Sequence, residues 1–227
     1  MFWYDTTIIL LIPAIIITII AQIHVKSTFQ KYSRVNSLRG YTGGMLAREI
    51  LDKNGLYHIR VEHTQGHLTD HYDPRAQVIR LSDSVYNSTS VASLGVAAHE
   101  VGHAIQYKED YMPIRIRQAV IPVTQIGSQL AFPLTIFGLI FSWDPLIWIG
   151  ILLFIAVVFF QLVTLPVEFN ASGRALRTLE GDGILGDTEL EGAKKVLRAA
   201  AMTYVAALIT ALANLARLLA LANRRER

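Results

Sequence analysis

Long apolar runs alternate with mixed polar segments along the 227-residue chain. Residues 6–23 carry no charge and consist largely of Ile and Leu. About 20 apolar residues in a helix cross the hydrocarbon core of a bilayer, so this run predicts a transmembrane anchor. Phe2, Trp3 and Tyr4 precede it, where aromatic side chains mark a membrane interface. A cleaved signal peptide is disfavoured, because no Lys or Arg precedes the run and no small-residue cleavage site follows it.

Two further apolar runs form a pair. Residues 119–141 and 146–165 are free of charge and are separated by a short break, Ser142 to Pro145. A pair of buried core helices is the alternative, but two charge-free runs of this length favour lipid. We therefore predict a transmembrane helical hairpin over residues 119–165.

The last apolar run, residues 199–222, is ambiguous. It is rich in Ala and Leu but contains Asn214 and Arg217. Thr188 and Glu191 have capping-box spacing and predict a helix that starts before it. The sequence thus predicts a mainly α membrane protein with three or four transmembrane helices, the last of them a possible fourth span.

The distribution of Lys and Arg predicts the orientation. Basic side chains follow the first apolar run and precede the second, whereas the N-terminal head and the hairpin tip carry none. By the positive-inside rule, residues 24–118 and, after the hairpin, residues 166–198 lie in the cytoplasm. A fourth crossing would export Arg224, Arg225 and Arg227 against that rule. Either the C-terminal helix does not cross and lies in the interface or against the hairpin, or the rule fails here. We favour a weakly held span.

The polar segment, residues 24–118, has the pattern of an α+β portion. Apolar spacing predicts helices over residues 42–51 and 90–107. Residues 57–62 and 77–81 have the alternating or continuous pattern of strands. We expect this segment to be the catalytic portion, and residues 166–198 to be a second cytoplasmic segment that completes its site.

Composition narrows the function classes. Charged residues make up 17% of the chain, against about 25% in soluble domains, which agrees with a membrane protein. The absence of Cys excludes disulfides, Cys-ligated zinc and a thiol nucleophile. A net charge of +3 without a basic, aromatic-rich stripe argues against nucleic acid as a partner.

One motif carries specific chemistry. His99-Glu100-Val101-Gly102-His103 has the pattern H-E-x-x-H. On a helix the two imidazoles face the same side and can bind one Zn²⁺, while Glu100 can act as general base toward a zinc-activated water. Two surface histidines on an ordinary helix are the alternative. The apolar residues around the motif predict a buried helix, where such side chains need partners.

The third metal ligand lies elsewhere in the chain. No His follows His103, so an H-E-x-x-H-x-x-G-x-x-H site is excluded. An upstream His or a downstream carboxylate remains. Glu168 is the best placed, because the two apolar runs between it and the motif return the chain to the same side of the membrane. A carboxylate that simply faces water at the membrane edge is the alternative.

The chain resembles the YugP-like neutral zinc metallopeptidases of bacterial membranes. The matching stretches cover most of the chain and keep their order; they are residues 68–75, 81–86, 97–106, 165–169 and 200–206. The resemblance implies a zincin-like fold of the gluzincin type, with His99, His103 and Glu168 as zinc ligands and Glu100 catalytic. It also implies a strand edge that binds the substrate backbone, for which residues 77–81 are the candidate.

Three further residues are weaker candidates for supporting or substrate-binding roles. Asn170 stands where the family pattern has Asp, and it can still donate and accept hydrogen bonds. Arg174 can pair with an acidic group near the site. His71 lies in a matching stretch. His63, His67 and His71 are spaced four apart, but Gly66 argues against a helix that would align them as a second metal site.

Three functions are compatible with the sequence. The first is a membrane-anchored zinc endopeptidase that acts on peptides or proteins, with quality control of membrane proteins as its role by analogy. The second is a non-catalytic membrane scaffold or chaperone-like adaptor that contains zinc. The absence of Cys and the presence of Glu100 argue against structural zinc. A metal transporter is the weakest, since the two central runs hold no ionisable residue.

Overall fold

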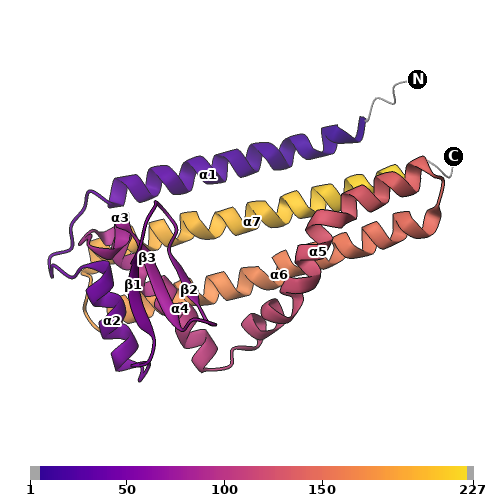
Figure 1. Cartoon of the computed structure of the whole chain (residues 1–227). Coiled ribbons are helices and arrows are strands. Elements are labelled where there is room, and N and C mark those ends of the chain that lie inside the picture. Colours follow the sequence, from indigo (N-terminus) through magenta and orange to yellow (C-terminus); the bar gives the residue numbers. More distant parts are fainter. Residues whose placement is uncertain (1–5, 224–227) are drawn as a thin grey trace. The chain divides into compact units, whose positions relative to one another are not determined.

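The computed structural model describes residues 6–223, which are mainly helical (Figure 1). The elements in chain order are the 3-10 helix η1 (Thr6–Leu11), α1 (Ile12–Tyr32), α2 (Gly43–Lys53), β1 (Arg60–Thr64), β2 (His71–Asp73), β3 (Val78–Ser82), α3 (Asp83–Tyr86), α4 (Val91–Lys108), α5 (Met112–Ile140), α6 (Asp144–Gly181) and α7 (Asp187–Asn223). The aromatic residues at positions 2–4 and the arginines at 224, 225 and 227 lie outside the described residues.

Four helices are long and apolar enough to cross a membrane. They are Thr7–Tyr32, which combines η1 with α1, and then α5, α6 and α7. Of the three or four transmembrane helices expected from the sequence, the described residues thus contain four candidates by length and composition.

The chain forms two compact units that interleave in sequence. The globular unit comprises residues 23–111 and 167–202. The membrane unit comprises, within the described residues, 6–22, 112–166 and 203–223. Helices α1, α6 and α7 each contribute residues to both units.

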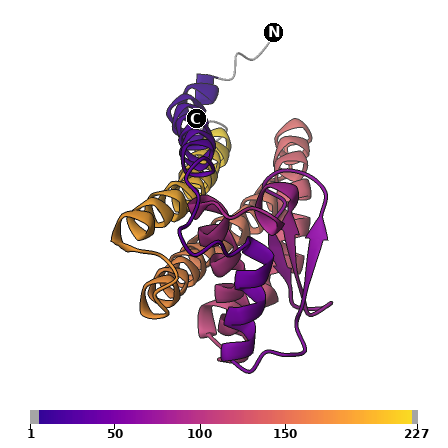
Figure 2. The ribbon, with the colours of Figure 1, turned by 90° about the vertical axis from the view of Figure 1, so that its left-hand side faces the viewer.

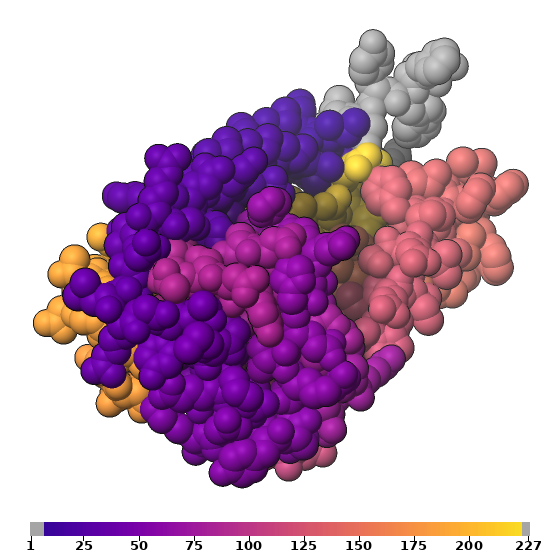
Figure 3. Space-filling model, turned by 60° about the vertical axis from the view of Figure 1, so that its left-hand side comes forward, coloured from indigo at the N-terminus to yellow at the C-terminus, as the bar shows by residue number. Residues whose placement is uncertain are grey.

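The globular unit is built on a three-stranded sheet with the strand order β1-β3-β2. β1 pairs with β3 in parallel, and β2 pairs with β3 antiparallel. Figure 2 shows α2 beside these strands, and in Figure 3 they form one packed surface. The expectation that residues 77–81 provide a free edge is wrong, because β3 is the central strand and is hydrogen-bonded on both sides. Its residues are buried except for Arg80, which is partly buried.

Side-chain caps start the two main helices of the globular unit. The Thr42 hydroxyl accepts a hydrogen bond from the Met45 N–H before α2, and the Ser90 hydroxyl accepts one from the Ser93 N–H before α4. Such caps satisfy N–H groups that have no partner within the helix. The core of the unit lies between α4, α2 and the sheet, with Leu46, Ile79, Leu81, Leu94 and Val101 among its fully buried members.

In the membrane unit, α5 and α6 form the expected helical hairpin and pack closely. A Cβ at Gly127 would lie 2.6 Å from the carbonyl oxygen of Leu153, and one at Gly150 would lie 2.6 Å from that of Ala131. Small residues let membrane helices approach each other in this way. α5 begins at Met112, seven residues before the charge-free run that predicted it.

The start of α7 differs from the predicted capping box. The Glu189 carboxylate accepts a hydrogen bond from the Gly186 N–H, and Thr188 lies inside the first turn. The reciprocal carboxylate of the helix start is therefore Glu189, and the prediction based on Thr188 and Glu191 is wrong. The other carboxylate oxygen of Glu189 accepts a hydrogen bond from the Leu38 N–H. This bond ties the start of α7 to the loop after α1.

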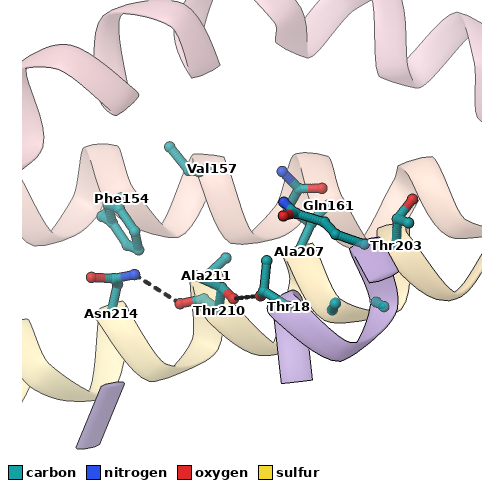
Figure 4. A pocket seen from close by; sticks show the side chains of 12 residues that line it. Thr18, Phe154, Val157, Gln161, Thr203, Ala207, Thr210, Ala211 and Asn214 are labelled. Carbon is teal, nitrogen blue, oxygen red and sulfur yellow. Dashed lines mark hydrogen bonds between the residues drawn. The ribbon is translucent and has the colours of Figure 1, made fainter. Parts of the chain in front are cut away.

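A mainly apolar cavity of about 420 Å³ lies within the membrane unit (Figure 4). Its hydrogen-bonding side chains come from α1, α6 and α7, and they are Thr18, Gln22, Gln161, Thr203, Thr210 and Asn214. The Thr18 and Thr210 hydroxyls are 3.0 Å apart, and Asn214 donates to the Thr210 carbonyl. The contact between the two hydroxyls connects α1 with α7, whereas the Asn214 bond lies within α7.

Candidate metal centre

Helix α4 places the two histidines of the motif side by side. His99 and His103 are one turn apart, and their ring centroids lie 4.7 Å apart with an interplanar angle of 81°. The Nε2 atoms of both rings face the same carboxylate. The helix is anchored by its apolar face, where Ala97, Val101 and Ala104 are buried in the core. A buried face fixes the rotation of the helix, and with it the direction of both imidazoles.

Helix α6 supplies that carboxylate. Glu168 Oε2 lies 3.3 Å from His99 Nε2 and 3.6 Å from His103 Nε2. One ligand atom from each of these three residues lies within 4.8 Å of the others. Within residues 6–223 this is the one group of three or more His, Asp or Glu side chains with such geometry. The structure thus brings together the three residues predicted as ligands.

The site is shielded but not sealed. The side chains of His99 and His103 are 15% and 12% exposed, and that of Glu168 is 3% exposed. Glu100, the remaining polar residue of the motif, is also buried. Burial alone would lower the pKa of His103, but the hydrogen bond and charge of Glu168, with the charge of Glu100, raise that pKa above its ordinary value.

A glycine allows α4 and α6 to come this close. A Cβ at Gly102 would lie 2.8 Å from the carbonyl oxygen of Ala171 on α6. Gly102 precedes one proposed ligand, His103, and Ala171 lies one turn after another, Glu168, so the close contact lies beside the donors. The sequence motif leaves this position unspecified, and no pattern within α4 indicates that a partner backbone lies against it.

The second nitrogen of each imidazole also has a partner. The Ser172 hydroxyl lies 3.2 Å from His99 Nδ1, and the Gln106 side-chain oxygen lies 2.9 Å from His103 Nδ1. The sequence alone does not single out Ser172, which follows a matching stretch, or Gln106, which ends one. Only the packing of α4 against α6 reveals their contacts.

Gln106 is the start of a longer hydrogen-bond chain. Its amide nitrogen donates to the Val167 carbonyl at 2.8 Å and to Asn170 Oδ1 at 3.0 Å. The Nε of Arg174 donates to the same Asn170 oxygen at 2.7 Å, and its Nη2 lies 2.7 Å from the Glu109 carboxylate. The Arg174 guanidinium lowers the pKa of Glu109. Two of the weaker sequence candidates, Asn170 and Arg174, therefore lie directly behind the histidine cluster.

The third weaker candidate, His71, makes different contacts. It lies on β2, exposed, with Nδ1 2.7 Å from the Thr69 carbonyl and Nε2 3.3 Å from Arg80 Nη1. His63 pairs instead with Asp83. Gly66, between them, has a φ of +110°, a backbone conformation that breaks any helical alignment. Among the described residues these histidines form no second metal cluster.

The distances around Glu168 fit a metal ion better than a direct ion pair. Ligands of a tetrahedral zinc, each about 2.0–2.1 Å from the ion, lie roughly 3.4 Å apart. The Oε2 to Nε2 separations of 3.3 and 3.6 Å match that spacing. A charge-assisted N–H to O bond is shorter, about 2.7–2.9 Å. Two imidazoles and one carboxylate also form a known catalytic zinc donor set.

Comparison with known proteins agrees with this geometry. Residues 7–223 match the profile of a family described as "Putative neutral zinc metallopeptidase". The chain is also 48% identical over 210 residues to the "Putative membrane protease YugP" of Bacillus subtilis (strain 168), covering 92% of this chain and 93% of that one. No solved structure matches the chain. On both the profile and the relative, the chain belongs to the neutral zinc metallopeptidase family described by that profile.

Proposed function

We propose that the protein is a membrane-anchored, zinc-dependent endopeptidase. The observation that carries this proposal is the convergence of His99, His103 and Glu168 from two helices, at spacings suited to one zinc ion. Family membership supports it independently. A bound Zn²⁺ would supply Lewis acidity, which polarises a scissile carbonyl and makes water more acidic.

Glu100 is proposed as the general base. It is adjacent to His99 on α4 and points about 100° around the helix from it, so it is close to the donor set without belonging to it. Its carboxylate takes the proton of the attacking water and passes it to the leaving amine. Burial of Glu100 excludes bulk water as a competing proton acceptor.

We further propose that an extended substrate pairs with the edge of β2, in the manner of a zincin. Among the described residues, β2 has a ladder partner on one side only, β3. It lies next to α4, where the Tyr72 and Tyr107 rings are 5.5 Å apart in an edge-on contact. An added strand would gain backbone hydrogen bonds independent of its sequence. The proposed binding edge is therefore β2, the neighbour of the strand that contains residues 77–81, which the sequence suggested.

The cellular setting is part of the same proposal. The basic residues that flank the apolar runs favour a cytoplasmic globular unit and cleavage at the cytoplasmic membrane face. Peptides or proteins, membrane proteins among them, are the expected substrates. A role in membrane-protein quality control rests on fold-level analogy.

The alternative is a scaffold whose zinc only stabilises the fold. Structural zinc usually has four protein ligands, and the described cluster has three. A buried carboxylate beside the cluster is costly unless it serves the chemistry or has a partner. Both observations favour the enzyme.

The test compares zinc content and peptidase activity in detergent-purified protein. We expect about one zinc per chain in wild type and Glu100→Gln, and loss of zinc in Glu168→Ala. Glu100→Gln should lower kcat by about 10²–10⁴-fold. Glu180→Ala, an exposed change on the same helix, is the matched control and should behave as wild type.

Three outcomes would change the proposal. Full zinc in Glu168→Ala means that the third ligand lies elsewhere. Unchanged activity in Glu100→Gln rules out its role as base. Zinc binding without any peptidase activity in wild type, on unfolded protein and membrane-protein substrates alike, favours the scaffold.

A further inference from the structure

The hydrogen bonds behind His103 indicate which of its two ring nitrogens carries the proton. The Gln106 amide contacts the Val167 carbonyl, which can only accept a hydrogen bond. The amide nitrogen must therefore point at Val167, and the amide oxygen must point at His103 Nδ1. The reverse orientation would set two oxygens against each other.

The next link fixes the same orientation independently. Arg174 Nε can only donate, so the Asn170 atom 2.7 Å from it is the oxygen. The same oxygen accepts the second N–H of Gln106. Gln106 is fully buried, and both of its N–H groups and its oxygen are used. The amide thus has one orientation that satisfies all of its neighbours.

We propose that Gln106 is a positioning residue that selects the metal-binding tautomer of His103. Its oxygen accepts the Nδ1 proton, which leaves the Nε2 lone pair directed at the cluster with Glu168. Asn170 acts one step further out, by holding Gln106 in place, and Arg174 with Glu109 holds Asn170. The inference rests on the proposed zinc site, and it concerns how that site is kept ready rather than what it cleaves.

Two substitutions separate this role from simple packing. Gln106→Met has a similar length but offers no oxygen to His103. Gln106→Glu keeps an oxygen for the Nδ1 proton but can no longer donate to Val167 and Asn170. A packing role predicts that both variants weaken zinc binding alike. The tautomer role predicts that Gln106→Glu unfolds at a lower temperature yet binds zinc well, because a carboxylate is a strong acceptor for an imidazole N–H.

The experiment measures the zinc Kd of full-length protein in detergent by competition with a chelator, and the absorption spectrum of the Co²⁺-loaded protein. We expect Gln106→Met to bind zinc about 10–100-fold more weakly, with an altered cobalt spectrum. Gln106→Glu should stay within a few-fold of wild type. Gln30→Met, an exposed change in the same unit, should match wild type in both measurements.

A second pair of variants tests the outer link and applies even if Gln106→Met fails to fold. Asn170→Asp keeps the oxygen that accepts from Gln106 and Arg174, so it should bind zinc as wild type does. Asn170→Leu removes that oxygen and should bind several-fold more weakly. Equal zinc affinity in Asn170→Leu and Asn170→Asp would overturn the outer link.

The possible failures can be told apart. Wild-type affinity and spectrum in Gln106→Met would overturn the inference while leaving the zinc site intact. Equal weakening in Gln106→Met and Gln106→Glu would also overturn it, in favour of packing. Absence of zinc from wild type would overturn the proposed function itself.

Discussion

At the scale of single residues, Gly102 is a position where one added methyl group would act directly on the proposed metal centre. It lies between the two motif histidines and close to the backbone of α6. A Cβ at this position would lie 2.8 Å from the Ala171 carbonyl oxygen. Backbone atoms cannot rotate out of the way as a side chain can. An added methyl must therefore separate the helices that carry the proposed ligands.

We expect Gly102→Ala to lower the free energy of unfolding by about 1–3 kcal/mol, as overpacking does, and to weaken zinc binding with it. Thermal unfolding and zinc titration of the same sample check this. Gly181→Ala is the matched control, since a Cβ there meets nothing within 4 Å. If Gly102→Ala binds zinc and unfolds as wild type does, the contact between α4 and α6 does not set the donor spacing.

Asp70 is a second residue whose environment leads to a measurable effect. Its carboxylate accepts the Ser82 N–H at 2.7 Å and the Ser82 hydroxyl at 3.0 Å, at the end of the central strand. Burial raises the pKa of Asp70 despite these hydrogen bonds. An acid with a raised folded pKa binds its proton more tightly when folded, so its charge costs stability as the pH rises through that pKa.

Asp70→Asn removes this charge and keeps an oxygen for the Ser82 N–H. We expect the Tm of Asp70→Asn, relative to wild type, to rise as the pH increases from about 4 to 7. A series of Tm measurements across that range checks it, with the exposed Glu180→Gln as control. A Tm difference that is independent of pH would contradict the assigned cause.

The motif residues could be predicted from sequence because their spacing on one helix is sufficient to align them. His99, Glu100 and His103 fall into this class, and the return of the chain through the hairpin pointed to Glu168. Gly102, Gln106 and Ser172 belong to another class. Their roles depend on contacts between α4 and α6, which join residues more than 60 positions apart, and no local pattern encodes those contacts.

At the scale of elements, the strands show why an edge is harder to predict than a strand. The sequence indicated both β1 and β3, but β2 is only three residues long and contains His71, Tyr72 and Asp73. So short a strand has too few positions for a period to be read. Without it β3 looks like an edge, and with it β3 becomes the centre.

Helices α1 and α7 are linked by the Thr18 and Thr210 hydroxyls, at 3.0 Å. We expect Thr210→Val to lower stability by about 0.6 kcal/mol, the mean for hydrogen bonds between membrane helices. Unfolding in detergent, followed by SDS titration, checks the value. Thr124→Val is the control, because its hydroxyl bonds only to the Val120 carbonyl of its own helix in the described contacts. Equal losses in the two variants would mean that the link between helices contributes nothing.

At the scale of the whole molecule, one helix contributes to both units, although the composition of the sequence suggests a boundary within it. The change from apolar to polar residues near position 166 suggested a boundary, and Pro166 usually ends a helix. Instead α6 runs through both, from Asp144 to Gly181. Membrane helices tolerate proline because neighbouring groups satisfy the freed backbone carbonyl. Polarity indicates where a helix meets water, and it does not determine where the helix stops.

The absence of cysteine makes the topology directly testable with single introduced thiols. Tyr57 is 73% exposed in the globular unit, Ser142 lies between α5 and α6, and Asn223 ends α7. With four spans and a cytoplasmic globular unit, a membrane-impermeant maleimide should label Ser142→Cys and Asn223→Cys on intact cells. Tyr57→Cys should react only after permeabilisation.

Each thiol decides a separate point. Labelling of Asn223→Cys only after permeabilisation would mean that α7 does not cross the membrane. Labelling of Tyr57→Cys on intact cells would reverse the proposed orientation of the whole protein.

The order of the elements along the chain also determines when each proposed ligand is synthesised. The ribosome makes α4 first, then the whole of α5 and most of the apolar part of α6, and only afterwards Glu168. On the proposed ligand assignment, a nascent chain still in the cytosol holds two imidazoles and no complete donor set. Hydrolytic competence would arrive only once synthesis has passed the hairpin and reached Glu168. A chain whose synthesis stops within the hairpin would then lack the third proposed ligand and stay inactive.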